Sequence, residues 1–243
     1  MKLAVEKLEA GYQGKTVKDV SFTVEKGEFI SLIGPSGCGK STVLKVLAGL
    51  LEPMAGTIMV DDAPLQGGSR HFSYMPQSDL LLDWYDILDN VCLYGKIHGK
   101  KKEAQQQALE NLKEFGLAGY EHAYPSQLSG GMRQRAAFLR TALCDSDILL
   151  LDEPFGALDV ITREDMQDWL NRMRQRLDRT TLLVTHDIDE AIYLSDRILI
   201  LGQRPATITR IVDVRHPHKD RAWLYAQGEL RAAIHQELSH EVL

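Results

Sequence analysis

The sequence predicts an α/β protein with a mainly parallel core sheet. Two observations predict this class: short apolar runs alternate with helical segments along much of the chain, and a glycine-rich loop joins one such run to a helix. The run Phe29–Ile33 leads into the loop at residues 34–42, and an apolar segment with helical spacing follows to Ala48. In sheets of this kind, ligands bind at the carboxyl ends of the strands.

The loop itself predicts a phosphate site. It reads Gly-Pro-Ser-Gly-Cys-Gly-Lys-Ser-Thr and fits the pattern G-x-x-x-x-G-K-[ST]. Its glycines allow backbone N–H groups to line one hollow, and the following helix adds a positive dipole. We expect Lys40 to reach the β- and γ-phosphates and the Ser41 hydroxyl to ligate Mg²⁺. The predicted nucleotide-binding residues are Gly34, Pro35, Ser36, Gly37, Cys38, Gly39, Lys40, Ser41 and Thr42.

Charge and composition narrow the function classes. The 243-residue chain has a formal net charge of −6, which argues against broad nucleic-acid binding because such binding needs a basic surface. No apolar run approaches the roughly 18 residues of a membrane span, so we expect any membrane association to go through a partner. The three cysteines lack metal-ligand spacing and suit a reducing cytosol.

The N-terminal third is predicted to hold short strands separated by turns. The expected strands are Leu3–Val5, Val20–Val24, Phe29–Ile33, Thr57–Val60 and Phe72–Met75. Tyr12 lies on one of the turns. Its ring either stacks on an adenine or packs at a strand edge, and the pattern leaves both interpretations open.

Residues 78–144 are predicted to be mostly helical. Apolar side chains recur at helical spacing at Ala104, Ala108, Leu112 and Phe115, and the lysines at 100–102 indicate a solvated helix start.

A second helix start is predicted further along. Ser129 is placed as the N-cap of a helix that runs to about Cys144. Gly130 and Gly131 leave backbone N–H groups uncovered there, which favours a second anion site.

The segment 147–153 is typical of a buried parallel strand, because it is apolar at 148–151 and ends in two carboxylates. Asp152 is expected to hold Mg²⁺, directly or through water, near the phosphate loop. Glu153 is expected to orient and deprotonate an attacking water as general base.

Strands and helices then alternate. We expect a helix over 162–177, strands at Thr181–Val184, Arg197–Leu201 and Ala206–Val212, and a helix near Ile188–Leu194. His186 follows a strand end, level with Gly34 and Asp152, and is predicted to contact the γ-phosphate. After Pro217, a tail with about 20 helical residues is expected to pack on the domain rather than to regulate it.

Taken in order, these motifs resemble the nucleotide-binding subunit of an ABC transporter. The resemblance rests on the phosphate loop, Gln77, Leu128–Met132, Leu151–Pro154, Gly156–Asp159 and Thr185–Asp187, and it extends from Tyr12 to about Val212. The Leu-Ser-Gly-Gly signature separates this family from other P-loop proteins. The resemblance implies one ABC-type P-loop NTPase domain over residues 1–243. It implies an N-terminal antiparallel β subdomain, an inserted helical subdomain at about 78–144 and a helical tail at about 217–243.

The resemblance also implies roles for these residues. The cofactors would be ATP and Mg²⁺, with adenine stacked on Tyr12. The implied catalytic residues are Lys40, Gln77, Glu153 and His186, and the implied metal ligands are Ser41, Gln77 and Asp152.

The signature implies a dimer. By resemblance, Ser129, Gly130 and Gly131 act on the nucleotide of the opposite subunit, and Asp159 belongs to a loop that crosses the interface. Two anion sites on one chain are explained by a head-to-tail homodimer that closes around two ATP molecules.

The residues of these motifs are similar to those of bacterial importers, in the nitrate/sulfonate/taurine branch that includes importers of thiamine-precursor pyrimidines. It implies integral membrane permease subunits, an indirect extracytoplasmic solute-binding protein and a peripheral position on the cytoplasmic side of the membrane. Asp83-Trp84 and Val160-Ile161 depart from the usual residues and leave the cargo open. Trp84 and Tyr85 either meet the permease or pack in the core. The alternative function is a soluble ABC-type ATPase without a permease, in an assembly or repair role.

Overall fold

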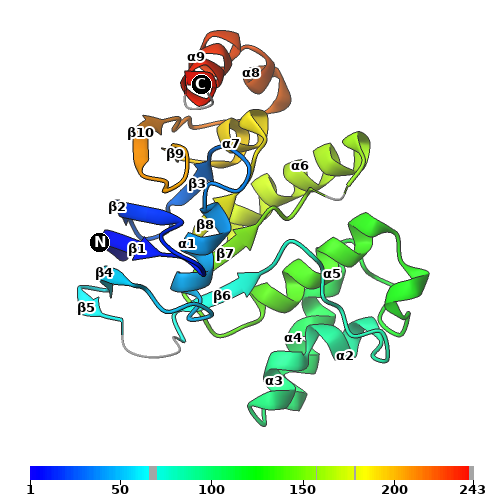
Figure 1. The fold of residues 1–243 in the computed structure, drawn as a ribbon. Coiled ribbons are helices and arrows are strands. Elements are labelled where there is room, and N and C mark those ends of the chain that lie inside the picture. Colours follow the sequence, from blue (N-terminus) through cyan, green and yellow to red (C-terminus); the bar gives the residue numbers. More distant parts are fainter. Residues whose placement is uncertain (66–69, 157, 178, 241–243) are drawn as a thin grey trace.

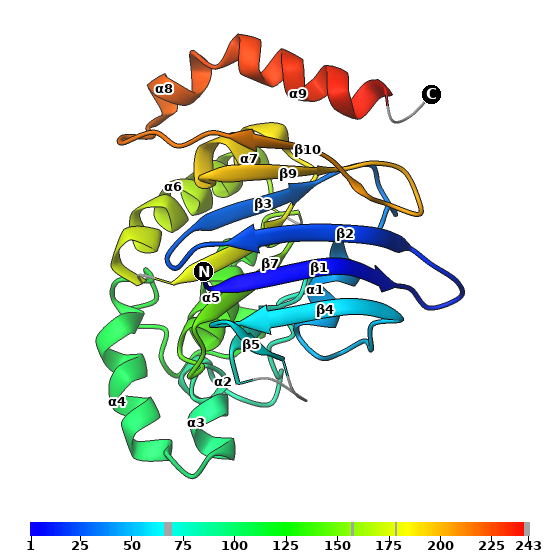
Figure 2. The ribbon, with the colours of Figure 1, turned by 90° about the vertical axis from the view of Figure 1, so that its left-hand side faces the viewer.

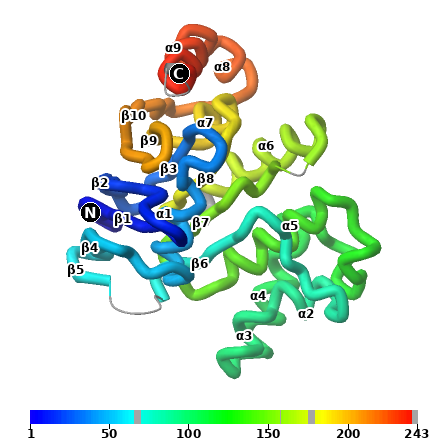
Figure 3. Tube along the Cα trace, in the orientation of Figure 1, coloured from blue at the N-terminus to red at the C-terminus, as the bar shows by residue number. Residues whose placement is uncertain are grey.

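Two sheets and the helix between them organise the chain. The computed structural model describes residues 1–65, 70–156, 158–177 and 179–240. Figures 1 and 2 show a smaller sheet beside a central one, with α2–α5 gathered on one side and α8–α9 across one end. The trace in Figure 3 carries the N-terminus on the smaller sheet.

The smaller sheet is antiparallel and has the order β2-β1-β4-β5. Its strands are β1 (Leu3–Ala10), β2 (Val17–Val24), β4 (Ala55–Val60) and β5 (Ala63–Pro64). Strand β2 alternates as a one-sided strand should, because Val20, Phe22 and Val24 are buried while the residues between them are exposed. The expected N-terminal antiparallel sheet is therefore confirmed, with β1 and β2 longer than predicted.

The central sheet has the order β10-β9-β3-β8-β7-β6, and its pairs from β9 to β6 are parallel. Its strands are β3 (Phe29–Ile33), β6 (Phe72–Met75), β7 (Ile148–Asp152), β8 (Thr180–Val184), β9 (Arg197–Leu201) and β10 (Ile208–Asp213). Strand β10 runs antiparallel to β9. A mainly parallel core, as predicted, is confirmed. The last strand begins later than expected, because Ala206 instead forms a bridge to Val17 of the smaller sheet.

Both faces of the central sheet are covered. Helix α1 (Lys40–Leu47) lies between the two sheets, where Ile148 and Leu150 of β7 join its apolar cluster. Leu149 and Leu151 point to the opposite face and join the cluster of the larger helices. Burial on both faces explains why β7 reads as a continuous apolar run.

The inserted helices pack through one apolar stripe. They are α2 (Ile87–Val91), α3 (Leu93–Ile97), α4 (Lys101–Leu112), the 3₁₀ turn Pro125–Gln127 and α5 (Gly130–Ala142). The predicted stripe at 104, 108, 112 and 115 is buried, and the lysines at 100–102 are exposed. Trp169 of α6 (Val160–Leu177) joins this group to the core, with its ring edge-on to Phe115 and Phe138 at 4.8 and 5.2 Å.

The tail after Pro217 forms two helices, α8 (Arg221–Tyr225) and α9 (Gly228–His240), where one helical stretch was expected. Asp220 caps α8 by accepting from Trp223 N. The tail packs on α7 (Ile188–Leu194): Lys219 donates to the carbonyl of Ile192 in the last turn and to that of the C-cap Ser195. Residues 241–243 of the predicted tail lie outside the described residues.

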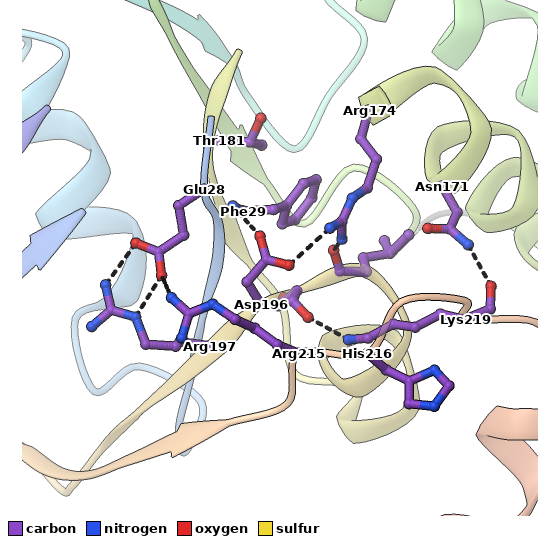
Figure 4. Close-up of polar contacts among 12 residues, drawn as sticks. Glu28, Phe29, Asn171, Arg174, Thr181, Asp196, Arg197, Arg215, His216 and Lys219 are labelled. Atoms are coloured by element: carbon purple, nitrogen blue, oxygen red, sulfur yellow. Dashed lines mark hydrogen bonds and ion pairs between the residues drawn. The ribbon is translucent and has the colours of Figure 1, made fainter. Parts of the chain in front are cut away.

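An ion-pair network around the buried Glu28 holds the segment at Arg215, which leads into the tail (Figure 4). Glu28 is 5% exposed and accepts from Arg197 at 2.6 Å and from Arg215 at 2.5 Å. Asp196 accepts from the Phe29 N–H and from Arg174, at 2.9 and 2.8 Å. Burial, and then the nearby Arg174, lower the pKa of Lys219 to about 7.

Within the described residues, no helix has the length and apolar character needed to cross a membrane.

Trp169→Ala is expected to destabilise the protein by about 3–5 kcal/mol, because it removes a buried ring and leaves a cavity between α6 and the inserted helices. Urea unfolding measures the loss. Trp84→Ala is the matched control, since Trp84 is 71% exposed and its removal should change stability by less than about 0.5 kcal/mol. Equal losses in the two variants would contradict the packing described for Trp169.

Candidate nucleotide-binding site

The phosphate loop follows β3 directly and depends on glycines for its shape. Gly37 and Gly39 have φ angles of 75° and 126°, in the left-handed region that favours glycine. At Gly39 an added Cβ would also lie 2.6 Å from Val17 Cγ1. This close approach ties the loop to the smaller sheet.

Lys40 opens α1 and is 5% exposed. Its ammonium donates to the carbonyls of Gly34 and Pro35 at 2.9 and 3.0 Å, across the top of the loop. Cys38 is also buried, and burial raises the pKa of its thiol. The structure thus folds the predicted loop around one buried cation.

Asp152, at the end of β7, receives two hydroxyl donors. Ser41 Oγ donates to Oδ1 at 2.7 Å, and the Tyr74 hydroxyl donates to Oδ2 at 2.8 Å. Burial, and then the Asp152 charge, raise the pKa of the Tyr74 phenol. The predicted pair of Ser41 and Asp152 is brought into contact. Tyr74 was missed, because a tyrosine in a predicted strand carries no local signal of what it contacts.

Glu153 adopts a left-handed backbone conformation, with φ at 46°. Its side chain accepts from Gln77 Nε2 at 3.1 Å and lies 3.4 Å from His186 Nδ1. A non-glycine residue with such a φ angle is held there by its surroundings, and such residues gather at functional sites. The predicted residues Gln77 and His186 therefore both contact the carboxylate of the third, Glu153.

A hollow of about 200 Å³ is lined by residues of the loop and α1 and by one of the predicted carboxylates: Thr16, Ser36, Gly37, Gly39, Lys40, Ser41, Thr42 and Glu153. Asp152 is outside this lining and contacts it through Ser41, and Gln77 and His186 contact it through Glu153. Where Ser41 meets Asp152, the atoms that could ligate a metal ion are a hydroxyl oxygen and carboxylate oxygens. Hard oxygen donors suit Mg²⁺, which also keeps several waters. The residues present therefore fit the metal.

Ser129 caps α5, as predicted, by accepting from Met132 N at 3.3 Å. Close packing joins this helix start to the beginning of α6, because a Cβ on Gly131 would lie 2.6 Å from Thr162 Cγ2. Asp159 caps α6 by accepting from Thr162 N, and the Thr162 side chain, followed by this N–H, lowers the pKa of Asp159. Ala157, between Gly156 and Asp159 in the predicted motif, lies outside the described residues.

The structure does not bring every predicted residue to the hollow. Helix α5 lies apart from α1 in Figure 1, so the two predicted anion sites of one chain do not face each other. The Tyr12 ring is 65% exposed, with Lys45 Nζ 5.8 Å from its centroid. Trp84 is 71% exposed and is not a core residue.

Residues 17–156 match the model of the family described as ABC transporter. The chain belongs to this family. Membership makes it an ATP-binding protein that hydrolyses ATP, and it confirms the predicted family and fold class.

Relatives of this ABC protein match along most of their length. It is 41% identical to the taurine import ATP-binding protein TauB of Yersinia pestis bv. Antiqua (strain Antiqua), over 96% of this chain and 90% of the relative. It is 50% identical to the aliphatic sulfonates import ATP-binding protein SsuB 1 of Rhodococcus jostii (strain RHA1), over 85% and 80%. It is 46% identical to the formylaminopyrimidine import ATP-binding protein ThiZ of Halalkalibacterium halodurans, over 84% and 80%.

A solved structure supports the same fold. The ABC chain superposes with a TM-score of 0.74 on the ATP-binding cassette MJ0796 in a dimeric post-hydrolysis state bound to ADP and Pi. The two are 28% identical, and the match covers 88% of this chain and 99% of that one.

A polar cluster around the buried Glu190 follows His186 closely in the chain. Glu190 of α7 is 3% exposed and accepts from Gln167 of α6 at 3.5 Å. Arg163 donates to Leu158 O at 3.0 Å and lies 3.8 Å from Asp187, the cap of α7. These contacts join the loop before α6 to the histidine segment. Sequence reasoning missed Glu190 and Arg163, because each reads as an ordinary helical charge.

Glu190→Gln is expected to change how stability depends on pH. Burial, and then the Asp187 charge, raise the pKa of Glu190 to about 8 from 4.5. The folded wild type therefore holds a proton that the unfolded chain has released, and stability is lost as pH rises from about 5 to 8. The loss is at most about tenfold in the folding equilibrium constant per pH unit. Glutamine cannot ionise, so the variant should lack this contribution. Urea unfolding between pH 5 and pH 8 compares them, and parallel profiles would contradict a buried, protonated Glu190.

Proposed function

We propose that this chain is the ATP-hydrolysing subunit of a bacterial importer and works as a head-to-tail homodimer. The observation that carries the proposal is that Lys40, Asp152, Glu153 and His186 gather at the carboxyl ends of neighbouring parallel strands. Helix α5, which Ser129 caps, lies apart from α1. Each chain then offers half of two sites, and two chains complete both.

Phosphate binding is assigned to the loop and α1. Backbone N–H groups of residues 34–39 and the helix start surround the phosphates, and Lys40 supplies the charge. Thr42 borders the same hollow. Ser41, Gln77 and Asp152 are proposed to hold Mg²⁺, which when bound neutralises charge on the β- and γ-phosphate oxygens. Tyr12, exposed beside Lys45, is free to stack on adenine.

Water activation is assigned to Glu153. Its carboxylate accepts a proton from the attacking water. Gln77 and His186, which contact this carboxylate, orient both the carboxylate and the water. His186 is 55% exposed and lies 3.4 Å from Glu153, which lines the hollow, and this position favours a contact to the γ-phosphate. Positioning and charge are the main needs of phosphoryl transfer, and these side chains supply both.

The opposite chain is proposed to supply Ser129, Gly130, Gly131 and Asp159. An uncovered helix start attracts the γ-phosphate of the partner's nucleotide, and closure excludes water from the site. The dimeric state of the related cassette MJ0796 supports this arrangement.

Membrane attachment is proposed to go through integral membrane permease subunits on the cytoplasmic side. The exposed Trp84, close after Gln77, suits such a contact. The names of the relatives favour a sulfonate, taurine or a thiamine-precursor pyrimidine as cargo. An extracytoplasmic solute-binding protein would deliver it. We further propose that residues 1–243 form one ABC domain, with about 78–144 as the helical subdomain and about 217–243 as the tail.

Lys40→Ala should weaken ATP binding by at least about 100-fold, because it removes the buried charge that faces the phosphates. Isothermal titration calorimetry with ATP measures the loss. Lys102→Ala, at an exposed helix start, is the matched control and should bind like wild type. Unchanged affinity in Lys40→Ala would overturn the assignment of the phosphate loop.

Glu153→Gln should lower the hydrolysis rate by about 10²–10⁴-fold, because an amide cannot accept the proton. ATP binding should remain, so the variant should accumulate as a dimer with ATP, seen by light scattering. Adding Ser129→Arg should restore the monomer, since the bulky cation blocks the facing helix start. Near-normal hydrolysis would exclude Glu153 as the base, and an ATP-bound monomer would argue for a single-chain enzyme. The exposed Glu52→Gln is the control.

A further inference from the structure

Tyr74 lies on the strand next to Asp152, with its side chain on the same face. In the parallel pair of β6 and β7, Tyr74 is level with Leu150, two residues before Asp152. Side chains two apart on a strand point to the same face. Leu150 and Tyr74 both contact the apolar cluster that contains α1. The Tyr74 hydroxyl therefore reaches Asp152 on the side where Ser41 lies.

The two hydroxyls hold opposite oxygens of one carboxylate. Asp152 is 4% exposed, Ser41 donates to Oδ1 at 2.7 Å and Tyr74 donates to Oδ2 at 2.8 Å. One donor alone would leave the carboxylate free to turn about its last torsion, which is broad for aspartate. With a donor on each oxygen, the plane of the carboxylate is set.

The orientation of Asp152 in turn sets that of Ser41. A serine hydroxyl has one proton and two lone pairs. Because the proton is directed to Asp152 Oδ1, the lone pairs of Ser41 Oγ point away from Asp152. A rotated carboxylate would redirect that proton and so turn the oxygen that faces a cation.

We propose that Tyr74 is a positioning residue of the divalent-cation site, which acts by fixing Asp152 and through it the Ser41 hydroxyl. This inference rests on the Mg²⁺ site of the proposed function and adds a phenol to its outer shell. Outer-shell partners of metal ligands typically contribute 10- to 100-fold in metal affinity. Tyr74 itself touches neither the cation nor the nucleotide.

The test is a Mg²⁺ titration of nucleotide binding, followed with the fluorescent analogue mant-ATP on the full chain. For Tyr74→Phe, we expect the half-saturating Mg²⁺ concentration to rise by about 10- to 100-fold, while affinity for mant-ATP in EDTA stays unchanged. Tyr74→Leu, which also lacks the hydroxyl, should show the same shift. Thermal unfolding of each variant shows that it is folded.

Tyr193→Phe is the matched control. Tyr193 is 4% exposed, and burial, followed by the Asp168 carboxylate outside the site, raises the pKa of its hydroxyl. Its loss should leave the Mg²⁺ titration unchanged, and an equal shift in this control would overturn the inference. A wild-type titration in Tyr74→Phe, with a shifted one in Ser41→Ala, would overturn the role of Tyr74 and leave the proposed site standing. Unshifted titrations in Ser41→Ala and Asp152→Asn would remove the metal site and the inference together.

Discussion

The register of three parallel strands is the constraint on which the site depends. Leu32 of β3, Val184 of β8 and Asp152 of β7 lie in one row across the sheet. The ladder continues past the row, because Thr185 N donates to Leu32 O and Glu153 N donates to Val184 O. Asp152 stands in the row itself. Gly34, Glu153 and His186 follow it by one or two residues on their own strands. A slip of one residue would turn every side chain of a strand to the other face and separate them.

The parts assigned to the opposite subunit's nucleotide are packed together within their own chain. Leu158 Cδ2 would lie 3.6 Å from a Cβ on Gly130, and Thr162 fills the space over Gly131. The start of α5 and the loop before α6 therefore share a surface. Arg163 extends that surface to Asp187, beside His186. A movement of α5 would thus shift the segment that contains His186 in the same chain, because side chains pack between the two.

Sequence reasoning predicted what local patterns encode. The phosphate loop, the cap at Ser129 and the buried strand at 148–152 each carry their signal within a few residues. The contact of Tyr74 with Asp152 joins residues 78 positions apart, and it follows only once β6 and β7 are known to be neighbours. Glu190 was missed for the same reason, since its bond from Gln167 of α6 joins residues 23 positions apart. The tail was predicted as one stretch because the cap at Asp220 and the break before Gly228 are weak signals.

At Glu153 the backbone conformation favours glycine, whereas the contacts of the side chain require a carboxylate. Its backbone lies in the left-handed region, which costs an ordinary residue about 1–2 kcal/mol and costs glycine almost nothing. Glycine would therefore relax the turn at the end of β7, but it would remove the carboxylate that Gln77 and His186 surround. With Glu153 as the proposed base, selection for heat resistance alone would favour glycine here and would give a more stable protein that does not hydrolyse ATP. Retention of the acid therefore has to be enforced by selection for turnover.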